Sequence, residues 1–255
     1  MKFWLIAIWR FIPTKWVIVS APFILLIFAF LGWFLFGGLF IEKVDPRVVA
    51  ATERLQQNLP RAERGDPETQ FAIGVIYRDG LTGAANPRAA AKWLERAARQ
   101  GHAPAQLAIG RLYAAGSGVA QNFARAAGWY RNAAVRSGYD EAQYALGALY
   151  FNGRGVENDF GAAVDWFKKA AMQGHAGAQS VLGAMYEKGW GIDRDLVSAY
   201  VWFSLAARQA AKAMAYRADI DPGKELEKLK TRISRLQLKK GSQRLRVLRR
   251  RIADR

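Results

Sequence analysis

The sequence predicts an all-α protein: a single N-terminal transmembrane helix, then an α/α superhelical solenoid of four repeats, then a basic C-terminal helix. Three observations predict this arrangement. They are an uncharged apolar run near the N-terminus, a set of residues that recurs four times at a spacing of 36 or 37, and a concentration of positive charge after residue 207.

A membrane anchor is predicted at residues 16–41. The 26 residues between Lys15 and Glu42 carry no charge and are mostly Ile, Leu, Phe, Val and Ala. As a helix this run would be about 39 Å long at about 1.5 Å per residue, which exceeds a bilayer hydrocarbon core of roughly 30 Å. Residues 1–15 mix aromatic and basic side chains, which is typical of an interfacial segment; a frayed tail is the alternative.

The side of the membrane is less well determined by the sequence. Basic residues flank the apolar run on both sides in nearly equal number, and long domains cross a membrane largely regardless of charge. We expect the N-terminus inside a bacterial inner membrane and the domain that follows on the periplasmic side. The alternative, a domain on the cytoplasmic side, is not excluded by the sequence.

Residues 66–210 contain four copies of one unit. A glycine recurs at 36, 37 and 36 residues. Other residues keep a constant distance from it: a Gln four residues before, a Tyr three residues after, and a Trp nineteen residues after. The glycines are Gly74, Gly110, Gly147 and Gly183, and the tryptophans are Trp93, Trp129, Trp166 and Trp202. Such self-similarity is the sequence signature of a repeat architecture.

Each unit is predicted to be a helical hairpin. In its first helix the Gln, the Gly and the Tyr share one face, and the Gly lets a second helix approach closely. A residue that favours helix N-caps stands seven positions before each Trp: Asn86, Asn122, Asp159 and Asp195. A glycine closes the second helix in three copies, at Gly101, Gly138 and Gly174. One hairpin cannot bury its apolar face alone, so neighbouring hairpins must stack.

The third copy, from Ala142 to Gly174, resembles the Sel-1-like repeat. That resemblance implies an α/α solenoid related to tetratricopeptide repeats, and a protein-interaction scaffold or regulatory adaptor of a bacterial envelope that helps assemble or stabilise a membrane complex. Two departures stand out. Thr82 replaces the second loop glycine of the first copy, and the last copy lacks the closing glycine. The absence of Cys excludes the cysteine-rich secreted branch of the family.

Two flanking segments are predicted to cover the ends of the solenoid. Residues 45–60 begin with Asp-Pro, a cap followed by a favoured first helical residue, and form a leading helix. Residues 222–255 form a basic tail whose Leu226, Leu229, Ile233 and Leu236 make a narrow apolar seam. We expect this seam to break at Gly241-Ser242 and to resume with Leu245, Leu248 and Ile252.

Catalysis is not expected. The chain has no Cys and two His, and His102 and His175 occupy the same repeat position, which favours packing between repeats. The acidic pairs in two loops contain the predicted caps Asp159 and Asp195, so they have a structural interpretation. No nucleophile triad or metal-binding motif is present. The sequence predicts neither a cofactor nor a metal.

A partner-binding surface is predicted on one face of the four first helices. It comprises positions three before, one after and four after each repeat glycine, which would line the inner surface of the superhelix. The candidates are Phe71, Val75, Arg78, Leu107, Arg111, Tyr144, Phe151 and Glu187. Large apolar groups beside arginines suit an extended or helical peptide. The alternative is that these side chains simply pack against the adjacent repeat.

The tail suggests a different function. Residues 208–255 carry a net charge of +11, out of +17 for the chain. The densest cluster is Arg244, Arg246, Arg249, Arg250 and Arg251. It could tether the protein to anionic lipid or to nucleic acid, although no aromatic residue follows Tyr216, which weakens a base-stacking role. There are two other interpretations of the tail. Its apolar seam could bind a partner helix, or its charged residues could simply form a solvated face.

Overall fold

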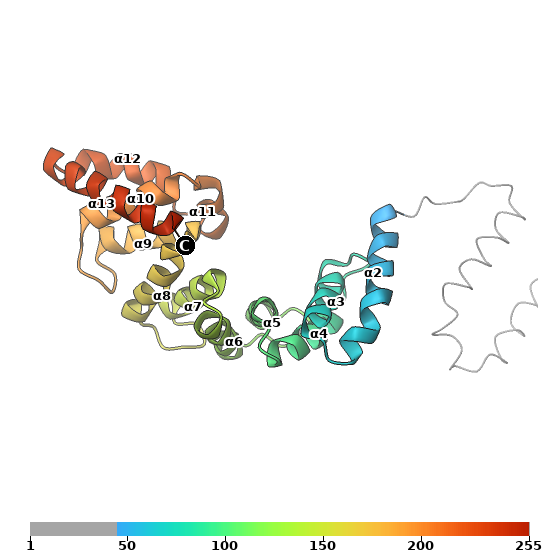
Figure 1. Ribbon diagram of the computed structural model, residues 1–255. Helices are drawn as coiled ribbons and strands as arrows, with labels where there is room; N and C mark the ends of the chain where they lie inside the picture. Colours follow the sequence, from blue (N-terminus) through green and yellow to red (C-terminus); the bar gives the residue numbers. More distant parts are fainter. Residues whose placement is uncertain (1–44, 255) are drawn as a thin grey trace, which may run out of the picture. The chain divides into compact units, whose positions relative to one another are not determined.

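Residues 45–254 of the computed structural model are described here, and they form twelve α-helices (Figure 1). The predicted segments 1–15 and 16–41 lie outside these residues. Among residues 45–254, none of the helices combines the length and the apolar character that a membrane span needs. The chain divides into two units, Met1–Val49 and Ala50–Arg255. Helices α3 to α13 belong to the second.

Helices α3 to α10 form four successive hairpins (Figure 1). The hairpins are α3 (Pro67–Asp79) with α4 (Pro87–Arg99), α5 (Ala103–Ala115) with α6 (Phe123–Arg136), α7 (Asp140–Asn152) with α8 (Phe160–Met172), and α9 (Ala176–Lys188) with α10 (Leu196–Ala207). Each second helix also packs on the first helix of the next hairpin. The predicted all-α repeat solenoid is confirmed. Helix α2 (Pro46–Glu63) precedes it and continues three residues past Pro60.

The repeat glycines have the predicted role of allowing close helix contact. A Cβ at Gly74 would lie 2.6 Å from Leu94 Cγ, and one at Gly183 would lie 2.8 Å from Phe203 Cδ1. Gly110 and Gly147 meet Tyr130 and Phe167 in the same way. In every hairpin the contacted residue directly follows the repeat Trp, so one column of glycines fits one column of large buried side chains.

The repeat glutamines join each first helix to the element before it. The Nε2 atoms of Gln70, Gln106, Gln143 and Gln179 donate hydrogen bonds to the carbonyls of Ala62, Ala98, Ala134 and Ala171. These carbonyls lie in the last turns of helices, where no backbone donor is available within the helix. Backbone N–H groups just past the helix also reach three of them, those of Ala62, Ala98 and Ala171, so the buried glutamine amide adds a second donor that links the two helices.

The predicted N-caps are confirmed in all four second helices. The side chains of Asn86, Asn122, Asp159 and Asp195 each accept a hydrogen bond from a backbone N–H in the first turn. Two further caps come from the histidines. His102 Nδ1 accepts from the Ala105 N–H of α5 at 3.2 Å, and His175 Nδ1 accepts from the Ala178 N–H of α9 at 3.1 Å. Their shared repeat position therefore serves helix capping.

The basic C-terminal segment forms more than the single helix that was predicted, and Gly241-Ser242, where the apolar seam was expected to break, does not interrupt a helix. Three helices follow the solenoid: α11 (Ala210–Tyr216), α12 (Pro222–Arg232) and α13 (Arg235–Ala253). The break falls at Ile233-Ser234, because Ser234 starts α13 with a capping box that includes Gln237. Gly241 lies inside α13, where a Cβ would be 2.6 Å from Tyr200 Cδ1. The absence of a side chain at Gly241 permits close contact with α10, and the residue does not end the helix.

The C-terminal segment completes the core of the last repeat. Helix α10 packs on α9, and both α12 and α13 pack on α10. Val201, Trp202, Phe203 and Leu205 of α10 are all buried. A helix that is apolar on all sides must be covered on all sides. Leu229 of α12 and Leu245 of α13 belong to the same core cluster, so the basic tail is part of the folded domain.

Candidate partner-binding surface

The predicted surface begins on α3, where its side chains are partly accessible. The Phe71 ring lies 4.8 Å from the ring of His102, the cap of the next hairpin. Val75, one turn further along, is half-buried. Arg78 follows on the same face and forms an ion pair of 2.7 Å with its neighbour Asp79. This part of the surface combines an apolar strip with a cation.

On α5 the predicted residues differ in exposure. Leu107 is buried in the core. The Arg111 side chain is 53% exposed and forms an ion pair with Glu141 of α7. Glu141 also accepts a hydrogen bond of 3.0 Å from the Tyr216 hydroxyl of α11. Arg111 therefore lies where the accessible part of the surface meets the C-terminal segment.

On α7 the surface is covered by the chain itself. The Tyr144 ring stacks on His175 at 4.6 Å between centroids and meets the edge of Tyr216 at 5.0 Å. Burial raises the pKa of Tyr144 to about 12. Burial, followed by the charge of Glu141, raises the pKa of Tyr216 to about 12. Both hydroxyls therefore remain protonated at neutral pH, and that of Tyr216 acts as a donor.

Phe151, at the end of α7, belongs to an aromatic cluster. Its ring lies 5.2 Å from Phe160 at the start of α8 and 5.6 Å from Trp190 in the loop after α9. Phe160 and Trp190 are both exposed. The cluster joins the third and fourth hairpins and leaves two rings in contact with solvent.

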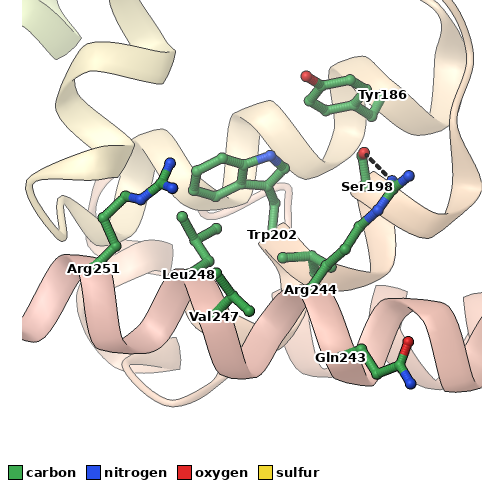
Figure 2. Close-up of a pocket in the computed structure, with 9 residues that line it drawn as sticks. Tyr186, Ser198, Trp202, Gln243, Arg244, Val247, Leu248 and Arg251 are labelled. Atoms are coloured by element: carbon green, nitrogen blue, oxygen red, sulfur yellow. Dashed lines mark hydrogen bonds between the residues drawn. The ribbon is translucent and has the colours of Figure 1, made fainter.

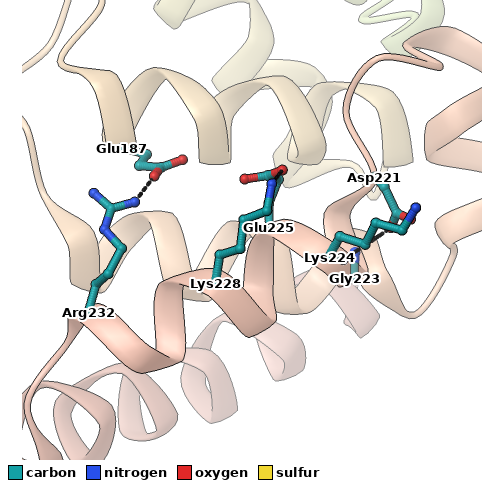
Figure 3. Close-up of polar contacts among 7 residues, drawn as sticks. All are labelled: Glu187, Asp221, Gly223, Lys224, Glu225, Lys228 and Arg232. Carbon is teal, nitrogen blue, oxygen red and sulfur yellow. Dashed lines mark hydrogen bonds and ion pairs between the residues drawn. The ribbon is translucent and has the colours of Figure 1, made fainter.

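Helix α12 covers Glu187 of α9 with the side chain of Arg232, as Figure 3 shows. Its side chain is 7% exposed and forms an ion pair with Arg232. Three further pairs lie along α12: Asp221 with Lys224 at 3.7 Å, Glu225 with Lys228 at 2.8 Å and Glu227 with Lys230 at 2.7 Å. Asp221 also caps the helix through the Gly223 N–H. Helix α12 is therefore held against α9 by a nearly buried ion pair.

The predicted surface thus has two parts. On α3 and α5 it is accessible at Val75, Arg78 and Arg111, and this part is called the open face below. On α7 and α9 it is covered by Tyr216 and Arg232 of the same chain. Sequence reasoning did not identify those two residues. A signal was present, because the segment 196–207 contains no charged residue and so has no side suited to solvent.

His175 is the most enclosed titratable group of this region. Its imidazole lies between Tyr144 and Tyr216, and burial lowers its pKa below the ordinary value of 6.5. The charges of Asp140 and Glu141 act in the opposite direction, and that of Arg111 acts with burial. Within residues 45–254, no group of three His, Asp or Glu side chains is placed to hold a metal ion.

Replacing His175 with Asn is expected to weaken the loss of stability in mild acid. The folded-state pKa is depressed, so protonation favours the unfolded chain, and the stability due to the neutral imidazole is lost as pH falls below about 6.5. Asn preserves an N-cap and does not titrate. The measurement is the Tm between about pH 7.5 and about pH 5.5, with His102→Asn as control. An equal fall of Tm in wild type and His175→Asn would contradict the assignment.

The five arginines of the tail lie on α13. All five are exposed, namely Arg244, Arg246, Arg249, Arg250 and Arg251. Arg244 reaches the cap of α10, with Nη1 at 3.3 Å from Asp195 Oδ2. Arg244 and Arg251 line the edge of α13 next to α10, so the charges surround the part of α13 that does not pack on α10.

Comparison with known proteins gives one family and a group of solved structures with a similar fold. The Sel1 repeat family matches residues 67–102, 103–134, 140–175 and 176–210, which correspond to the four hairpins. A Sel1 repeat protein from Oxalobacter formigenes is 33% identical, with a TM-score of 0.59 over 64% of this chain and 63% of that one. A protective antigen of uropathogenic Escherichia coli strains, displaying an SLR fold, is 27% identical, with a TM-score of 0.50 over 78% of this chain and 49% of that one.

This chain therefore spans less than two thirds of either neighbour. No match was found among the curated proteins.

Proposed function

This chain belongs to the Sel1 repeat family, and from that premise we propose that it is a scaffold that binds a segment of a partner protein on the open face of α3 and α5. Sel1 repeat proteins generally mediate protein–protein interactions and are generally non-catalytic. The mechanism is binding alone. Stacked hairpins present a preformed surface, so little conformational entropy is lost on association.

The observation that carries this proposal is the occupation of the other half of the same surface. Helices α11 and α12 lie there, attached by the Tyr216 contacts and by the Glu187–Arg232 pair. The chain thus supplies an internal example of what the surface accepts: a helical segment with one aromatic group and one charged group. The open face offers an apolar side chain at Val75 and two exposed arginines, Arg78 and Arg111, which pair with Asp79 and Glu141 of the same chain.

The proposal includes a membrane anchor at residues 16–41. Its support is the uncharged run of 26 residues. With the N-terminus inside, the solenoid would take part in a periplasmic complex at a bacterial inner membrane. Protease treatment of intact spheroplasts tests this orientation. Digestion of the solenoid without lysis is expected, and protection until lysis would contradict it.

A second candidate function is an electrostatic tether to an anionic membrane surface. The exposed arginines of α13 favour it, since basic residues near such a surface each contribute about 1 kcal/mol. Association that falls steeply with salt and does not depend on the open face would favour this function over the scaffold.

Crosslinking from the open face tests the scaffold directly. A photoreactive phenylalanine analogue at Val75 or Ala114 is expected to capture a partner in cells, whereas the same analogue at Lys92, exposed on α4, is not. Arg78→Ala combined with Arg111→Ala is expected to weaken association with that partner by about 1 kcal/mol, roughly five- to tenfold.

Two results would contradict the proposal. One is equal capture at Lys92 and at Val75. The other is capture that the double alanine variant leaves unchanged.

A further inference from the structure

Helices α10 and α13 enclose a groove that is separate from the open face. It has a volume of about 470 Å³. Figure 2 shows Trp202 of α10 in its centre, Val247 and Leu248 of α13 beside it, and Arg244 and Arg251 on either side. The groove therefore has an apolar centre with a guanidinium at each end.

The apolar centre extends onto the exposed side of α13. Val247 is 60% exposed and Leu236 is 63% exposed. They are eleven residues apart, which is close to three turns, so they lie on one stripe of the helix. Of the two, Val247 lines the groove and Leu236 does not, so Val247 supplies the exposed aliphatic surface of the site.

The two arginines are available to an external anion. Arg251 has no carboxylate partner among residues 45–254. Arg244 has only long contacts, 3.3 Å to Asp195 Oδ2 and 3.5 Å to Ser198 Oγ. The arginines are seven residues apart, so they lie about two turns, or about 10.5 Å, apart along α13. Two carboxylates seven residues apart on a partner helix have the same separation.

We propose that the groove between α10 and α13 binds an acidic amphipathic helix of a partner protein. Two carboxylates of that helix, seven residues apart, pair with Arg244 and Arg251, and an apolar side chain between them packs on Trp202 and Val247. Guanidinium and carboxylate match each other in charge and in bidentate geometry. The apolar centre favours a protein segment over a free phosphate, which would leave Val247 exposed to water.

This site does not depend on the open face, so either proposal can fail alone. Its residues lie on α10 and α13, whereas those of the open face lie on α3 and α5. Loss of crosslinking at Val75 would leave the groove proposal intact, and loss of groove binding would leave the scaffold proposal intact.

The test uses the full chain and a fluorescent synthetic helix. The probe carries two Glu residues seven positions apart with a Leu between them, and the control peptide has Gln in place of each Glu. Fluorescence polarisation measures both affinities. The Glu peptide is expected to bind about tenfold more tightly than the Gln peptide.

A matched pair of double variants locates the binding. Arg244→Ala with Arg251→Ala is expected to weaken binding of the Glu peptide about tenfold. Lys239→Ala with Arg246→Ala removes the same charge from the same helix at the same spacing, but on the opposite flank of the Val247 stripe. This control is expected to retain nearly wild-type affinity.

Three results would overturn the proposal. One is equal weakening by both double variants, which would indicate general charge attraction. Another is equal affinity of the wild type for the Glu and Gln peptides. The third is displacement of the bound peptide by phosphatidylglycerol vesicles but not by phosphatidylcholine vesicles, which would make the groove a lipid-headgroup site.

Discussion

Replacing Gly118 with Ala is expected to lower the free energy of unfolding by about 3 kcal/mol or more. The residue has a φ of +72°, and a Cβ there would lie 2.1 Å from the Pro87 carbonyl oxygen at the start of α4. Left-handed backbone costs a non-glycine residue about 1–2 kcal/mol, and overpacking against backbone typically adds about 1–3 kcal/mol. Thermal unfolding of the full chain should show a Tm lower by roughly 6–12 °C.

Gly101→Ala is the matched control for this experiment. Gly101 also has a left-handed φ, of +88°, but a Cβ there would meet nothing within 4 Å. Gly101→Ala is expected to lower the free energy of unfolding only by the cost of the left-handed backbone, about 1–2 kcal/mol. Equal losses in the two variants would show that the contact between the first two hairpins does not depend on Gly118.

The same contact recurs along the solenoid and explains a departure in its first copy. Cβ atoms at Gly155 and Gly191 would lie 2.2 and 2.3 Å from the backbone carbons of Phe123 and Phe160. Each is the second loop glycine, lying against the start of the previous hairpin's second helix. The first hairpin has Thr82 at this position. The element before it is the single helix α2, so no second helix of an earlier hairpin requires a glycine there.

Leu229→Ala is expected to destabilise the last repeat by about 3 kcal/mol. Leu229 of α12 is 1% exposed and belongs to the core around α10. Truncating a buried leucine to alanine costs about 2–5 kcal/mol, because the apolar contacts are lost and a cavity remains. Circular dichroism melting is the measurement.

Leu236→Ala is the control, since this leucine of α13 is 63% exposed. It is expected to change stability by less than about 0.5 kcal/mol. If both variants behave alike, the C-terminal helices are not part of the cooperative core. The distinction bears on function as well, because removing residues 222–255 would uncover Trp202 and Val201 and would not test the basic helix alone.

Much of the fold was predictable because repeated local patterns encode repeated local contacts. The Asn and Asp caps could be identified from residue type and spacing, since capping needs only the nearest backbone N–H groups. The repeat glycines could be read as close-contact points. The glutamine column was recognised as a column, but its bond to the carbonyl of the preceding helix was not, because that partner is defined only when two elements meet.

The candidate surface was predictable in position but not in accessibility. Phe71, Arg78 and Arg111 lie on the first helices as expected. Helical periodicity could not predict that Tyr216 covers Tyr144, because these residues are 72 positions apart in the chain. The position of Arg232 on Glu187 likewise depends on where α12 docks.

The helical hairpins, their number in residues 66–210 and their caps follow from local sequence, because hydrogen bonds and side-chain spacing within a few residues specify them. The packing of the C-terminal segment follows instead from contacts between distant parts of the chain. Helix α10 is apolar on every side, so burying it requires α12 and α13 to fold back over it. That docking covers Glu187 of α9 and forms the groove beside Arg244 and Arg251, while Tyr216 of α11 covers Tyr144 of α7. Its cause is the free energy of removing apolar surface from water, which depends on which surfaces meet.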